Sequence, residues 1–369
     1  MAEHDSTSTV TIQLPPLPSE LRTAFVRFYE DALNGREPNA SALDVVALPY
    51  FDEKGGDPGS VDQFFNAFTP LWNHRLARGE WGPASAVWAW ALRPALAWES
   101  NRGGRLHKGT AFYFAAMTAI LAGDMDVGYL YAHRALEEDR LTHGAAAPRT
   151  PSLSLVAMDA ENVEQAFRAW VMEKARFVEL SLSVYRQTRG RALDFQHLRS
   201  KILDRPDCIE PTFLFSYCVA RLRRLDSIMP GGRDSDFGSQ LRLNILFDLT
   251  LVTDDVLRRV APGKWKFIDL AEVLASAVPL SLKRTDLRAV NGDFERNFAA
   301  TAAKILDGGY SLPDGRQLSG LEKDLALTYG CRNRGAHHLS GGGVINNRFG
   351  ELRQSLLNTA FLAVECLPV

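Results

Sequence analysis

The chain has 369 residues, 46% hydrophobic and 23% charged, which is enough for two domains with buried cores. Its formal net charge of −2 excludes a global basic field that would attract nucleic acid, so any such contact must come from a local basic patch. No uncharged apolar run of roughly 18 residues is present, which argues against a membrane span.

The cysteines are scattered, without the paired spacing of a metal site or the pattern of a disulfide framework: Cys208, Cys218, Cys331 and Cys366. This usage is typical of a reducing compartment. The first residues show no basic segment followed by an apolar run, so no secretory signal is predicted. We therefore expect a cytoplasmic protein with no membrane partner.

The N-terminal part of the chain begins with a polar and then proline-rich segment. Residues 1–20 are predicted to be a flexible tail, with a short strand at 9–14 as an alternative. From residue 21, Phe25, Phe28, Tyr29 and Leu33 recur at helical spacing and predict an amphipathic helix. A short strand is expected at residues 44–51.

Residues 61–144 have the pattern of helical hairpins. One pairs residues 64–78 with 83–100, and the second pairs 107–122 with 125–139; each turn places an acid directly after a glycine. The second hairpin resembles a tetratricopeptide unit in the following positions: Gly109, Tyr113, Gly123-Asp124, Tyr131 and Ala135-Leu136. The two turns are further apart than the ~34 residues of that repeat. The segment is therefore predicted to be a divergent helical array.

Further helices are expected at residues 162–185 and 213–228, before a glycine-rich polar segment at 230–235 that marks a domain boundary. After it, helices are predicted at 241–260, 267–277, 286–306 with a break near Asn291-Gly292, 321–337 and 349–367, with a small hairpin at 310–318. The fold class is all-α. The predicted domains are a tail (1–20), a helical-repeat-like recognition domain (21–230) and a C-terminal helical bundle (236–369).

The most informative segment is residues 329–339, where Arg332 is followed directly by Asn333 and five positions later by His337. Arginine is always charged and binds phosphate through a planar fork of donors. Histidine accepts and donates protons near neutral pH. An arginine and a histidine suffice for phosphodiester cleavage by a ribose 2′-hydroxyl, with no metal or other cofactor.

This segment resembles the Arg-x-x-x-x-His motif of the HEPN ribonucleases, in which Asn, Asp or His commonly follows the arginine. The resemblance implies an endoribonuclease in which Arg332 holds the scissile phosphate, His337 is the general base or acid, and Asn333 orients the histidine or the ribose. Arg334 and His338 are candidate substrate-binding residues. The resemblance also implies an RNA substrate, a homodimer, and a role as a bacterial toxin or antiphage effector, with the N-terminal helices binding a regulatory protein or antitoxin.

Helix geometry complicates this assignment. Five residues on an ideal helix separate Arg332 and His337 by ~140°, so the two side chains do not share a face. Gly335 lowers helix stability within the motif, and glycines follow at 341–343, so we expect the helix to bend or end here. A two-fold dimer would supply both residue types to one cleft.

A second hypothesis comes from a different class. Arginine and histidine at a helix C-terminus can also be structural, because their positive charge interacts favourably with the helix dipole. Under this hypothesis the chain is a non-catalytic helical adaptor. Its HEPN-like domain is then degenerate and only dimerises or binds a nucleotide or partner. Arg332 and His337 in an open polar cleft favour the enzyme. The same residues packed in a core, or held by internal carboxylates, favour the adaptor.

Three other groups of residues have a functional and a structural interpretation, and in each the structural one is favoured. Residues 183–224 are rich in arginine and lysine and form either an RNA-guiding surface or a solvated helix face. The tryptophans between 72 and 98 line a ligand groove or a helix–helix seam. A third set is a metal site or a turn with helix-capping acids: His107, Asp124, Asp126 and His133.

Overall fold

A computed structural model describes residues 13–144, 150–228, 236–278, 280–337 and 342–368. Every regular element in these ranges is a helix, and the β-structure there is limited to a single antiparallel bridge between Ser311 and Gln317, within the predicted hairpin. The all-α prediction is therefore confirmed. Residues 9–12 of the alternative N-terminal strand lie outside the described residues, and residues 13–18 are irregular.

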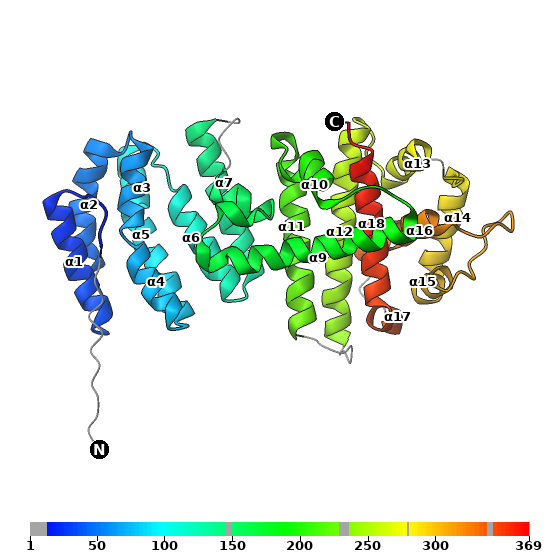
Figure 1. The fold of residues 1–369 in the computed structure, drawn as a ribbon, viewed down its shortest axis with the longest axis horizontal. Helices are drawn as coiled ribbons and strands as arrows, with labels where there is room; N and C mark the ends of the chain where they lie inside the picture. Colours follow the sequence, from blue (N-terminus) through cyan, green and yellow to red (C-terminus); the bar gives the residue numbers. More distant parts are fainter. Residues whose placement is uncertain (1–12, 145–149, 229–235, 279, 338–341, 369) are drawn as a thin grey trace, which may run out of the picture. The chain divides into compact units, whose positions relative to one another are not determined.

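The chain divides into two compact units, residues 1–152 and 153–369 (Figure 1). The helices of the first unit are α1 (Ser19–Leu33), α2 (Ala40–Lys54), α3 (Pro58–Asn66), α4 (Thr69–Ala77), α5 (Trp81–Arg102), α6 (Gly109–Leu121) and α7 (Met125–His143). Helix α8 (Pro151–Val156) lies at the division. Those of the second are α9 (Gln165–Arg189), α10 (Phe195–Leu198), α11 (Ile209–Ile228), α12 (Asp236–Val260), α13 (Phe267–Ala277), α14 (Arg284–Arg296), α15 (Phe298–Leu306), α16 (Gly320–His337), α17 (Gly342–Asn347) and α18 (Phe349–Glu365). Short 3₁₀ or π turns occupy Ala160–Asn162, Arg199–Leu203 and Pro206–Cys208.

This division differs from the boundary that the sequence places at residues 230–235. Composition marked that segment as a linker, but the helices before it bury their apolar faces against the helices after it. Helix α11 packs along α12, and α9 packs on α18. Tyr185 of α9 lies 5.7 Å from Phe361 of α18, and Phe215 of α11 lies 6.4 Å from the same ring, between centroids. Residues 153–228 therefore share a core with the C-terminal helices.

Helical hairpins build the first unit: α6 pairs with α7 as predicted, whereas the helix predicted at 64–78 is divided into α3 and α4, of which α4 packs on α5. In the α6–α7 hairpin, Asp124 caps α7 by accepting a hydrogen bond from the Val127 amide at 3.1 Å. A β-carbon at Gly128 would lie only 2.4 Å from a side-chain carbon of Ile120, so this glycine permits the close approach of the two helices. The tryptophans form a seam here: the Trp72 indole N–H donates to Thr118 at 2.7 Å, and both Trp72 and Trp88 pack against Phe114.

The strand predicted at residues 44–51 is wrong, because these residues lie inside α2. Asn39 caps the helix by accepting from the Ala42 amide at 3.0 Å. The buried positions are Leu43, Ala47, Tyr50 and Phe51, which recur at the three-to-four spacing of a helix. The β-branched pair at 45–46 therefore does not decide the local structure; Val45 is 71% exposed.

Helix α16 is packed against α12, α14, α15 and α18 in the second unit (Figure 1). Its approach to α14 is unusually close at Gly330, where a β-carbon would lie 2.6 Å from the ring of Phe294. The break predicted near Asn291-Gly292 lies instead at Asn297, whose side chain caps α15 by accepting from the Ala300 amide at 3.0 Å. The motif arginine is thus on a helix with neighbours on several sides.

Candidate active site

Helix α16 carries the motif, runs through Gly335 and ends at His337, which is one of the two outcomes expected for this glycine-rich segment. Its packing against α12 and α14 supplies stability that one glycine does not overcome, since a helical glycine costs only ~1 kcal/mol. Arg332 and Asn333 are both partly buried near the end of this helix.

Arg332 faces α12. Its Nη2 lies 3.5 Å from Oδ2 of Asp254, and its guanidinium carbon lies 5.2 Å from the centroid of the Phe247 ring. The buried Nε has no hydrogen-bond partner among the described residues. The side chain is 24% exposed, so the guanidinium is oriented by the protein but still reaches solvent. It retains N–H donors for an anionic ligand.

Asp254 binds a second arginine as well. Nε of Arg258 lies 3.0 Å from Oδ1 of Asp254, and Nη2 of Arg258 lies 3.3 Å from Oδ2. The Asp254 side chain is only 7% exposed. One nearly buried carboxylate therefore faces two guanidinium groups, with the contact to Arg332 the longer of the two.

Asn333 faces α14. Its Nδ2 donates a hydrogen bond to Oδ1 of Asn291, and Nδ2 of Asn291 donates to Glu295 at 2.7 Å. Burial raises the pKa of Tyr329, one turn earlier on α16, while a hydrogen bond from Asn333 opposes the shift. The Asn333 amide therefore belongs to a network that fixes α16 against α14, a partnership that the motif spacing alone did not predict.

The side chains of the other predicted site residues lie outside the described part of the chain. His337 is the last residue of α16, but its side chain and that of Arg334 lie outside the described residues, as does all of His338. That His337 and Arg332 meet in one cleft therefore stays a prediction.

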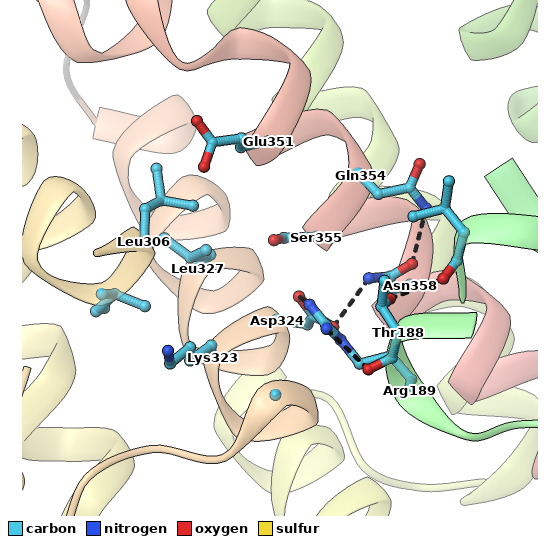
Figure 2. A pocket seen from close by; sticks show the side chains of 13 residues that line it. Thr188, Arg189, Leu306, Lys323, Asp324, Leu327, Glu351, Gln354, Ser355 and Asn358 are labelled. Carbon is cyan, nitrogen blue, oxygen red and sulfur yellow. Dashed lines mark hydrogen bonds and ion pairs between the residues drawn. The ribbon is translucent and has the colours of Figure 1, made fainter. Parts of the chain in front are cut away.

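A cavity of about 350 Å³ lies further towards the start of α16, among α9, α15 and α18 (Figure 2). Neither Arg332 nor Asn333 lines it. Asp324, fully buried, accepts hydrogen bonds from Nε and Nη2 of Arg189 at 2.5 and 3.0 Å and from Asn358 at 3.0 Å. No local pattern in the sequence predicts this network, because Arg189 and Asp324 are 135 positions apart.

The basic segment at residues 183–224 does not form an open cationic face. Most of its cations are compensated by carboxylates, in the pairs Arg189–Asp324, Arg191–Glu365, Arg199–Asp204, Arg205–Asp207, Arg221–Asp248 and Arg223–Glu173. Lys201 donates to the backbone carbonyls of Glu365 and Leu367 at 2.7 and 2.8 Å. These contacts favour the structural interpretation of the segment.

The histidines and acids of the first unit have structural partners. His107 Nε2 lies 3.6 Å from Oδ1 of Asp139 and 3.8 Å from Oδ1 of Asp62, and its Nδ1 lies 3.0 Å from the Thr142 hydroxyl. Within the described ranges, no group of three or more His, Cys, Asp or Glu residues is arranged to hold a metal ion. In the same part of the chain, no helix is long and apolar enough to cross a membrane.

No family model matches the chain, and no match was found among curated proteins or among solved structures.

Proposed function

We propose that the chain is a HEPN-type endoribonuclease that cleaves RNA by attack of a ribose 2′-hydroxyl without a metal cofactor. The observation that carries the proposal is that Arg332 is held by neighbouring side chains and still reaches solvent. This arginine is oriented by Asp254 and Phe247, remains 24% exposed, and belongs to the helix that ends at His337. A charged, partly accessible guanidinium is suited to bind a phosphodiester.

In the proposed reaction, His337 removes the proton from the 2′-hydroxyl, and the 2′-oxygen attacks the adjacent phosphorus. The bond from phosphorus to the 5′-oxygen breaks, and that oxygen leaves as a hydroxyl after taking up a proton. The products are a 2′,3′-cyclic phosphate and a 5′-hydroxyl. Arg332 holds the phosphate and stabilises its charge in the transition state, while Arg334 and His338 contact the flanking RNA.

The proposal includes a C2 homodimer formed through the C-terminal helices. On an ideal helix Arg332 and His337 point ~140° apart, whereas a two-fold pair brings two copies of each to one groove. Light scattering at micromolar concentration then gives about twice the chain mass of 40.9 kDa. A strict monomer with full cleavage activity contradicts the shared site.

The helical hairpins of the first unit are proposed to recognise a regulatory protein or antitoxin, as a divergent tetratricopeptide-like array does. In this setting the ribonuclease acts as a bacterial toxin or antiphage effector in the cytoplasm. Co-purification of the chain with its partner, lost on deleting residues 1–152, supports this role; an unchanged complex without them contradicts it.

The alternative function is a non-catalytic helical adaptor. One observation favours it: an internal carboxylate, Asp254, lies 3.5 Å from Arg332, as expected for an arginine with a structural role. The network from Asn333 to Asn291 is likewise explained by helix packing.

An RNA cleavage assay with EDTA present distinguishes the nuclease from the adaptor. Wild type is expected to cleave, and Arg332→Ala and His337→Ala are each expected to lose at least about 100-fold in rate, since one charge-stabilising donor contributes about 10²–10³. Equal cleavage by all three proteins excludes this site, and absence of cleavage in wild type favours the adaptor. Products that end in a 3′-hydroxyl contradict the proposed nucleophile.

Arg353→Ala is a matched control for Arg332→Ala. Arg353 of α18 is also 24% exposed, pairs with Asp226 at 2.8 Å, and lies 5.2 Å from the Phe177 ring. Both variants therefore lose a partly buried arginine that stacks on an aromatic ring, and we expect a similar loss of stability in each. Activity lost in Arg332→Ala but kept in Arg353→Ala is then attributable to the site and not to general destabilisation.

A further inference from the structure

The segment between α12 and α13 carries an exposed tryptophan among cations. Trp265 is 75% exposed, more than the other large hydrophobic residues on the described surface. Residues 256–268 contain Arg258, Arg259, Lys264 and Lys266 and no acidic residue, in a chain of net charge −2. This is the kind of local basic patch that RNA contact requires here.

The charges of this segment are only partly compensated. The carboxylates on either side of it are engaged by arginines: Asp254 by Arg258, Asp255 by Arg259 at 3.4 Å, and Asp269 by Arg284 at 2.5 Å. Both lysines beside Trp265 are exposed, and neither has an ion-pair partner among the described residues. Two ammonium groups therefore remain available to phosphates.

One face of Trp265 is already stacked. The guanidinium carbon of Arg258 lies 5.4 Å from the centroid of the ring, and Nη2 of the same arginine donates to the Trp265 carbonyl at 3.2 Å. These contacts hold Trp265 against Arg258, while 75% of the residue stays exposed to solvent. A fixed aromatic face beside cations is the arrangement on which bases of single-stranded nucleic acid stack.

Two series of side-chain contacts connect this loop to the motif. Arg258, under the Trp265 ring, shares Asp254 with Arg332. On the other side of the loop, the Phe267 ring stacks on Tyr329 of α16 at 5.8 Å between centroids, and Tyr329 is hydrogen-bonded to Asn333. The two series of contacts end on the adjacent residues Arg332 and Asn333, so the loop is held beside that turn of α16.

We infer that Trp265 is a stacking platform for a base of single-stranded RNA, with Lys264 and Lys266 contacting the adjacent phosphates, and that it guides the strand to Arg332. The assignment of RNA as the ligand rests on the proposed ribonuclease function. Since every base has a π-face, the platform accepts RNA with little sequence preference, and its lysines make binding dependent on salt.

The test measures RNA binding without cleavage. A fluorescein-labelled single strand of about 12 nucleotides with 2′-O-methyl groups lacks the nucleophile but keeps its bases and phosphates. Fluorescence anisotropy with the full chain is expected to give a Kd about 5- to 160-fold higher for Trp265→Ala, the loss of one stacked base, and nearly unchanged for Trp265→Phe. Lys264→Gln with Lys266→Gln is expected to weaken binding and reduce the salt slope by about 1.4.

Trp81→Ala is the matched control, because Trp81 is also exposed, at 40%, but follows Glu80 in the first unit. Its Kd is expected to equal that of wild type. Equal RNA binding by wild type and Trp265→Ala overturns the platform. A lower mass of Trp265→Ala in light scattering also overturns it, because Trp265 is then a contact between protein copies.

Failure of the platform and failure of the nuclease give different results. If wild type cleaves unmodified RNA in an Arg332-dependent way but Trp265→Ala binds and cleaves equally well, the platform is wrong and the nuclease stands. If Trp265 supports RNA binding but no Arg332-dependent cleavage occurs, the binding site stands and the nuclease is wrong.

Discussion

Gly330→Ala is expected to destabilise the second unit although alanine is the better helix former. The substitution gains ~1 kcal/mol of helix propensity. The new methyl group, however, meets the Phe294 ring at 2.6 Å, about 1 Å closer than ordinary contact. Phe294 is 3% exposed and packs against Phe298 at 5.4 Å between centroids, so its ring has little room to move. Overpacking of this kind costs about 1–3 kcal/mol.

Gly292→Ala provides the reference, because Gly292 lies within α14 and a β-carbon there meets nothing within 4 Å. Both variants gain the same propensity, so the difference between them isolates the overpacking and is expected to be about 1–3 kcal/mol in free energy of unfolding. Urea denaturation followed by circular dichroism measures it. Adding Phe294→Leu to Gly330→Ala relieves the contact and is expected to recover part of the loss. Equal stability of the two alanine variants refutes the close approach of α14 and α16.

Two further predictions concern buried charges. Asp324→Ala leaves Arg189 without its buried carboxylate and is expected to cost about 3 kcal/mol, whereas Asp207→Ala, which removes the 60% exposed carboxylate of the Arg205 ion pair, costs less than about 1 kcal/mol; similar urea midpoints for the two variants contradict this. Burial raises the pKa of Asp139 above its usual value, opposed by a hydrogen bond with Thr150 and by His107, so the folded state binds this proton more tightly than the unfolded state. Wild type therefore loses stability relative to Asp139→Asn as pH rises above about 4, through the folded pKa. Parallel melting profiles against pH for the two proteins contradict it.

The all-α class and most helices of the fold follow from local pattern. Residues 267–277 were predicted as a helix with the bounds that α13 has, because an apolar stripe lies between clear end signals. The strand predicted at residues 44–51 is wrong because the buried positions there have the spacing of a helix, and the break predicted near Asn291 lies at Asn297, whose side chain caps α15. The division at residue 152 depends on packing between distant helices, which no local composition encodes.

The candidate site was only partly predictable for a similar reason. Spacing identified Arg332 and Asn333, but their partners Asp254 and Asn291 come from helices 78 and 42 positions away. Trp265 was not identified because a single tryptophan between lysines has no periodicity; only its exposure in the folded chain distinguishes it from a core residue. The signal available in the sequence was the stretch of cations without acids at residues 256–268.

The charge balance around Asp254 bears on the choice between nuclease and adaptor. In the pairs Arg189–Asp324 and Arg221–Asp248 one guanidinium faces one carboxylate, while Arg316 faces two, Glu322 at 2.9 Å and Asp286 at 3.8 Å. Asp254 instead faces both Arg258 and Arg332, so one positive charge stays uncompensated beside a nearly buried carboxylate. Both guanidinium groups are attracted to this carboxylate, and they also repel each other as like charges. In the proposed nuclease, a phosphate bound to Arg332 supplies the second negative charge at this turn of α16, whereas the adaptor needs only the attraction between Arg332 and Asp254.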